Sequence, residues 1–92
     1  MTYSAKKCFE IKNIAGDFIL IPRGSEAVDY GAVLVLNETG AFLWNEMSEP
    51  ITASELTDKL VDKFSPDVEV ARRDVEAFIT KMCDNNLLDI HE

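Results

Sequence analysis

The segment VLVLNETGAFLW, residues 33–44, contains the end of a strand-like pattern and the start of a helical pattern. Residues 32–36 are apolar at every position and rich in side chains that favour strands. Asn37 is a preferred N-cap residue, and Glu38 places a negative charge in a first helical turn, where it suits the helix dipole. The apolar residues that follow recur at helical spacing: Phe42, Leu43 and Met47. The segment therefore predicts a buried strand that passes directly into a helix.

Two further strands are predicted upstream of this segment. Residues 9–12 alternate apolar and polar side chains, and residues 18–21 form a short apolar run before Pro22. Ala15, Gly16 and Asp17 lie between them and form a turn signal. Short connections between successive strands favour an antiparallel meander. Because a sheet this small is not stable alone, we expect helices to cover one face.

Two further helices are predicted downstream, after the turn residues 48–50. Thr52 and Glu55 have the spacing of a capping box. Residues 65–67, Ser-Pro-Asp, separate the helix that begins there from a third helix, residues 68–83, in which apolar residues recur every three or four positions. Asn85 and Asn86 can end that helix. The apolar residues of the tail are expected to pack back onto the core: Leu87, Leu88 and Ile90.

The predicted fold class is therefore α+β, with a three-stranded antiparallel sheet followed by three helices (βββααα). Two helices joined by a tight turn beside a small sheet resemble a winged helix-turn-helix. The length of 92 residues favours a single domain over residues 1–92, with its core at about residues 8–90.

Charge is distributed unevenly along the chain. The net charge is −8, yet residues 1–36 hold four basic and four acidic residues, so that residues 37–92 carry the whole excess. Because affinity for nucleic acid depends on Lys and Arg contacts to phosphates, this acidic surface argues against a nucleic-acid partner. No apolar run has the ~20 residues of a membrane span, and residues 1–7 lack the apolar core of a signal peptide. We expect a cytoplasmic protein without a membrane partner.

The residue types that catalysis requires do not converge in this sequence. His91 is the only histidine and lies one residue from the end of the chain, where segments usually fray. Cys8 and Cys83 are far apart in the sequence and form no CxxC motif, and the four glycines form no phosphate-binding pattern. We therefore expect no catalytic residues, no metal site and no cofactor, and predict that the chain is not an enzyme.

Two features point instead to binding. A strand that is apolar at every position is either buried on both faces or has one face available to a partner, and at the edge of a sheet it could pair with an incoming peptide strand. A dimer partner or the N-terminal segment could equally cover it. Arg72 in the third helix could pair with a ligand carboxylate, but an ion pair with Glu69 or Glu76 is at least as reasonable. For Trp44, a core position is the safer expectation.

The run from Leu36 to Trp44 resembles the LN-x-T-G-x-x-x-W signature of PqqD-like proteins. Residues 74–79, DVEAFI, and 86–88, NLL, resemble the D-V-x-x-F-L and G-L-L motifs that close that family's sequence. The resemblance extends over about residues 8–90. Two turns depart from the family pattern, because Ser48-Glu49-Pro50 replaces an Asp-Gly turn and Asn86 replaces a glycine.

The resemblance implies a peptide-recognition module for ribosomally made, post-translationally modified peptides. Such a module binds the leader of a precursor peptide by β-strand addition and presents the precursor to a modifying enzyme, commonly a radical SAM protein. Carried onto this chain, the resemblance implies a binding site on the third strand and the third helix: Ala32, Val33, Leu34, Val35, Leu36, Arg72, Val75, Glu76 and Ile79. The alternatives are a DNA-binding winged-helix protein, which rests on fold analogy alone, and a structural subunit or homodimer.

Overall fold

The computed structural model describes residues 1–22 and 34–92 of the chain. Its central sheet has the strand order β2-β3-β4, all antiparallel, with β2 at Phe9–Ile14, β3 at Asp17–Pro22 and β4 at Leu34–Leu36. Three helices follow: α2 at Glu38–Glu46, α3 at Ala53–Phe64 and α4 at Val68–Asp84. The prediction of a three-stranded antiparallel sheet followed by three helices is confirmed. Of the predicted third strand, positions 32 and 33 lie outside the described residues.

Local sequence accounts for the ends of these elements. Ala15 and Gly16 adopt positive φ angles of 53° and 87°, which turns β2 back into β3. Thr52 and Glu55 make both hydrogen bonds of the predicted capping box at the start of α3. Ser65 ends α3 in the left-handed conformation, and Asp67 caps α4 by accepting a hydrogen bond from the Glu69 N–H. The Ser-Pro-Asp turn therefore ends one helix and starts the next.

One hydrophobic core joins the sheet to all three helices. Leu20 of β3, Leu43 of α2 and Leu56 of α3 are at most 1% exposed. Trp44 is 5% exposed and packs edge-to-face on Phe9, with 6.4 Å between the ring centroids, so it is a core residue as expected. The predicted apolar stripe of α4 begins at Val68, which is 59% exposed in the first turn of the helix, and its other members lie in this core: Ala71, Val75, Phe78, Ile79 and Met82.

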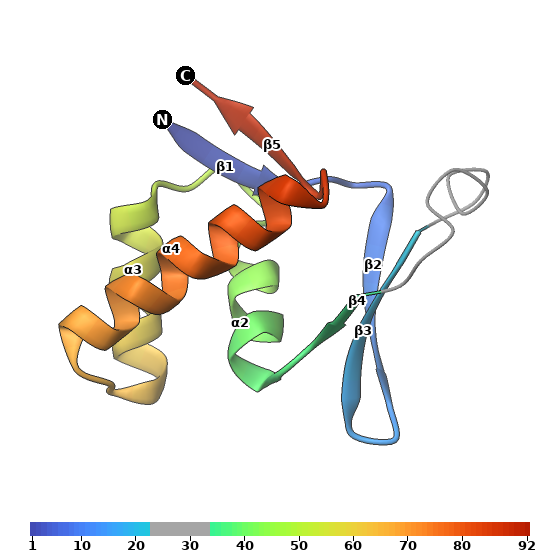
Figure 1. Ribbon diagram of the computed structural model, residues 1–92, viewed down its shortest axis with the longest axis horizontal. Helices are drawn as coiled ribbons and strands as arrows, with labels where there is room; N and C mark the ends of the chain where they lie inside the picture. The colour runs from blue at the N-terminus through green and yellow to red at the C-terminus, as the bar shows by residue number, and fades with distance from the viewer. Residues whose placement is uncertain (23–33) are drawn as a thin grey trace.

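The sequence patterns did not reveal a second sheet, which ties the two ends of the chain together. β1 at Thr2–Ala5 pairs antiparallel with β5 at Leu88–His91, and Tyr3 also bridges to Ile51. Figure 1 shows the two termini side by side, above the helices and far from the turn between β2 and β3.

The tail prediction is corrected at one position. Leu87 and Leu88 are buried, but Ile90 is 51% exposed. Ile90 shares a strand face with Leu88, but it pairs with Tyr3 nearer the end of the chain, beyond the part of that face that the core covers. His91 is exposed, but it is held in β5, where its Nε2 lies 3.0 Å from the Ser4 hydroxyl oxygen. Among the helices described, none has the length and apolar character needed to cross a membrane.

Candidate functional site

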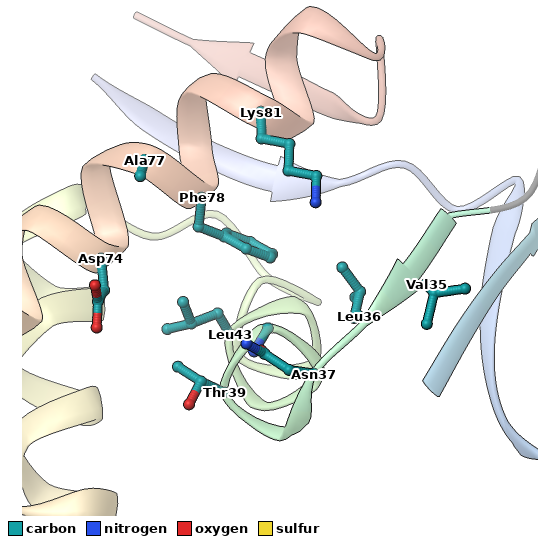
Figure 2. A pocket seen from close by; sticks show the side chains of 10 residues that line it. Val35, Leu36, Asn37, Thr39, Leu43, Asp74, Ala77, Phe78 and Lys81 are labelled. Atoms are coloured by element: carbon teal, nitrogen blue, oxygen red, sulfur yellow. The ribbon is translucent and has the colours of Figure 1, made fainter. Parts of the chain in front are cut away.

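A pocket of about 480 Å³ lies where β4, the first turns of α2 and one flank of α4 meet (Figure 2). Its lining comes from three adjacent parts of the fold: Val35, Leu36, Asn37, Thr39, Gly40, Leu43, Asp74, Ala77, Phe78 and Lys81. We refer to this pocket as the β4–α4 groove.

The floor of the groove is apolar and closely packed. Leu36, Leu43 and Phe78 all belong to the core cluster and are 5%, 1% and 9% exposed. Gly40 lets the first turn of α2 approach β4, since a Cβ atom at that position would lie only 3.3 Å from the Leu36 Cβ. The Asn37 side chain accepts a hydrogen bond from the Gly40 N–H at 2.7 Å and caps the helix. The floor is therefore fixed by the same contacts that connect the strand to the helix.

The rim of the groove is polar and accessible. Asp74 and Lys81 are both exposed, and neither forms an ion pair with another residue in the described part of the chain. Figure 2 shows the Lys81 side chain extending over the gap toward β4, whereas Asp74 lies at the opposite end of the groove. The groove therefore combines an apolar floor with two oppositely charged ends.

Strand β4 lies at an edge of the described sheet. It pairs with β3 on one side, through the partners Phe18–Leu36, Ile19–Val35 and Leu20–Leu34, and with no other described strand on the other side. Leu36 points toward α4, and Val35 points to the other face of the sheet, where it is 54% exposed. A strand edge beside an apolar groove is an arrangement that can take up an extended peptide.

The predicted site residues of α4 form two groups, one in the core and one beside α3, and none of them lines the β4–α4 groove. Val75 and Ile79 are 0% and 8% exposed and belong to the core. Arg72 and Glu76 line a separate hollow against α3, and Arg72 pairs with Glu69, which was the alternative interpretation of that residue. Of the predicted strand residues, Leu34, Val35 and Leu36 form β4, while Ala32 and Val33 lie outside the described residues.

Sequence reasoning did not select the α4 residues that do line the groove: Asp74, Ala77, Phe78 and Lys81. Their spacing, at i, i+3, i+4 and i+7, places them on one flank of a helix. That pattern was present in the sequence, but an amphipathic helix has two flanks beside its buried stripe. Only the position of β4 relative to the helix distinguishes the flank that forms the groove.

The described residues contain no group of three or more His, Cys, Asp or Glu side chains placed to hold a metal ion. The pKa of the Cys83 thiol is raised above its usual value, first by burial and then by the nearby Asp84 carboxylate. Since the thiolate is the reactive form, a raised pKa is the opposite of what activates a nucleophilic cysteine.

Comparison with known proteins identifies the fold and the family. Two solved structures are similar over almost their whole length: TbiB1 in complex with the TbiA(beta) leader peptide, and lasso peptide synthetase B1 complexed with the leader peptide. The first has a TM-score of 0.74 at 18% identity and covers 97% of this chain and 98% of its own. The second has a TM-score of 0.72 at 16% identity and covers 96% of this chain and 98% of its own. No curated protein sequence matches the chain.

The family model described as coenzyme PQQ synthesis protein D (PqqD) matches residues 18–88. This range covers more than three quarters of the chain and includes all the residues that line the β4–α4 groove. The resemblance inferred from the LNETG-W motif is thereby confirmed, and the chain belongs to the PqqD family.

Proposed function

We propose that this protein binds the leader segment of a ribosomally made precursor peptide by β-strand addition to β4. The observation that supports this most directly is the edge of β4, which pairs with no other described strand on its outer side, beside the β4–α4 groove. Membership of the PqqD family and the similarity to two proteins solved with leader peptides agree with it.

In the proposed complex, the leader extends the antiparallel sheet as a fourth strand. Its backbone N–H and C=O groups pair with those of β4, which provides affinity without requiring a particular side chain. Alternate leader side chains face α4. There they bury apolar surface against Leu36 and Phe78, and they leave the rim residues of α4 available for polar contacts.

We further propose that the protein acts as a non-catalytic adaptor in the cytoplasm. It would hold the leader while a separate modifying enzyme, which the family resemblance suggests is a radical SAM protein, acts on the rest of the precursor. In this role the sheet edge and groove need only bind and position the peptide. No described feature specifically favours the two alternatives, DNA binding and self-association, which stay predictions.

An NMR titration would test leader binding. The probe is a synthetic peptide with the leader sequence of a candidate precursor, chosen from the short open reading frames that neighbour this gene. We expect amide shifts at Leu34, Val35 and Leu36, together with shifts at Ala77 and Phe78 on the facing flank of α4. Shifts confined to the α3–α4 hollow or to the β1–β5 sheet would refute the proposed site.

A pair of variants on the same helix provides a matched control. Ala77 and Thr80 are both exposed, but Ala77 lines the β4–α4 groove and Thr80 does not. Ala77→Arg should fill the groove with a long charged side chain and weaken leader binding about tenfold or more, equivalent to about 1.4 kcal/mol. Thr80→Arg adds the same side chain and should leave the affinity within about twofold. Equal affinities for the two variants would contradict the groove model.

A further inference from the structure

The two ends of the β4–α4 groove carry opposite charges that no ion pair among the described residues neutralises. Asp74 and Lys81 are seven residues apart on α4, which corresponds to about 10.5 Å along the helix axis. Both are exposed, and within the described residues neither forms an ion pair. The apolar part of the groove, Ala77 and Phe78, lies between them. A ligand in the groove therefore meets a negative end, an apolar middle and a positive end.

The chain directions relate these charges to the edge of the sheet. In Figures 1 and 2, α4 runs from its Asp74 end toward the β1–β5 sheet, whereas β4 runs in the opposite sense, down to the first turn of α2. The first turn of α2, with Thr39, therefore lies at the Asp74 end, and Lys81 extends over the gap toward β4 at the other end. Since every described pairing in the central sheet is antiparallel, a strand added in the same manner would run from the Asp74 end to the Lys81 end.

On the basis of the proposed function, we propose that the groove recognises the order of charges in the leader. The recognised segment has a basic residue first, an apolar residue two positions later and an acidic residue two positions after that. The basic side chain meets Asp74, the apolar one packs on Phe78, and the acidic one meets Lys81. A peptide with the same composition but the opposite order of charges would place like charges together at both ends.

The dimensions of strand and helix are compatible with this pattern. Residues i and i+4 of an antiparallel strand are about 13.6 Å apart and face the same side. This exceeds the Asp74–Lys81 spacing by about 3 Å, which is within reach of a flexible Lys side chain with four methylene groups. Residues i and i+2, at about 6.8 Å, would reach only one charged end together with the apolar middle.

A selection experiment with peptides of random sequence tests the charge order. A displayed peptide library with eight random positions is selected for binding to the wild-type protein. The same library is selected against the double variant Asp74→Lys/Lys81→Asp, which exchanges the two charges at exposed positions and leaves the net charge unchanged. Circular dichroism and thermal unfolding establish that both proteins are equally folded. Enriched peptides are then synthesised in both charge orders for affinity measurements.

We expect the wild type to enrich basic-x-apolar-x-acidic segments and the double variant to enrich the reverse order. Each protein should prefer its matched peptide about tenfold, which corresponds to about 1.4 kcal/mol. Enrichment of groove-binding peptides with no charge order, or with the same order for both proteins, would overturn the charge inference while leaving leader binding intact. If Ala77→Arg does not weaken the binding of any enriched peptide, the proposed function fails at this groove, and the charge inference fails with it.

Discussion

Replacing Asn37 with Ala tests how the family motif stabilises the fold. The Asn37 side chain accepts a hydrogen bond from the Gly40 N–H at 2.7 Å, with the backbone extended at φ −80° and ψ 179°, the geometry of an N-cap. This bond satisfies one of the four N–H groups that have no partner within a helix at its N-terminus. Asn37→Ala removes the acceptor of the N–H of Gly40, a buried residue, while position 37 itself is exposed.

The expected cost is about 1 kcal/mol of unfolding free energy, within the range of about 0.5–2 kcal/mol found for the loss of N-cap side chains. Helix α2 contributes Leu43 and Trp44 to the core, at 1% and 5% exposed, so the loss should affect global unfolding rather than only fray the helix. For a domain of this size, 1 kcal/mol corresponds to a fall in Tm of about 4–8 °C.

Urea unfolding measures this cost, and the fluorescence of Trp44, the only tryptophan, reports on the core beside the mutated turn. Asn37→Asp is the matched control, because it keeps an N-cap acceptor and adds a negative charge that suits the helix dipole. We expect Asn37→Asp to unfold within a few tenths of a kcal/mol of the wild type. The reasoning is refuted if Asn37→Ala unfolds at the wild-type urea midpoint with an unchanged slope, or if Asn37→Asp loses as much stability as Asn37→Ala.

Three further predictions concern the core, the capping box and the partly buried thiol of Cys83. Leu43→Ala, at 1% exposed, should destabilise the protein by about 2–5 kcal/mol in urea unfolding, because it leaves a cavity under the groove. Hydrogen bonds from the Thr52 backbone and then its side chain lower the pKa of Glu55, so its carboxylate stabilises the fold above the ordinary value of 4.5, and this stabilisation is lost as the pH falls through the lowered value. The urea midpoint should therefore fall less across this acidic range in Glu55→Gln than in the wild type. In a Cys8→Ser variant, alkylation of Cys83 by iodoacetamide should accelerate with a midpoint above pH 9.0 in the native state, and a midpoint below that value would contradict the raised thiol pKa.

The elements of the fold that depend on local chemistry could be predicted from the sequence. The Thr52–Glu55 capping box, the Asn37 cap and the left-handed Asn86 after α4 each follow from residue types with one dominant conformational preference. The β1–β5 sheet could not be found in this way. Its strands are four residues long, and its pairing joins the two ends of the chain, so neither strand has a turn beside it that would fix its partner.

The groove could be predicted only in part, for a related reason. The strand was found because an apolar run before an N-cap is a local signal. Choosing a flank of α4 required the packing of that helix against both α3 and β4, which is a tertiary property. The buried stripe of α4, which includes Val75 and Ile79, has a flank on each side. The stripe alone therefore does not indicate which flank forms the groove. Arg72 was predicted as a site residue because its cation could pair with a ligand carboxylate. In the structure it forms an ion pair with Glu69 and lies on the flank of α4 that faces α3.

The LNETG-W motif, residues 36–44, and the residues that would discriminate among ligands are different residues. Leu36, Asn37 and Gly40 form the junction of β4 and α2, and they also line the floor of the groove. An apolar floor beside a strand edge offers contacts that many extended peptides can make, since backbone pairing and apolar burial are largely independent of side-chain identity. Substitutions in the LNETG-W motif would therefore change stability and, in the proposed complex, peptide binding together. Lys81 lies outside both family motifs, and Asp74 is the first residue of the second one, residues 74–79. Both are exposed on α4, so in the proposed complex their exchange would alter the choice of peptide while the fold stays intact.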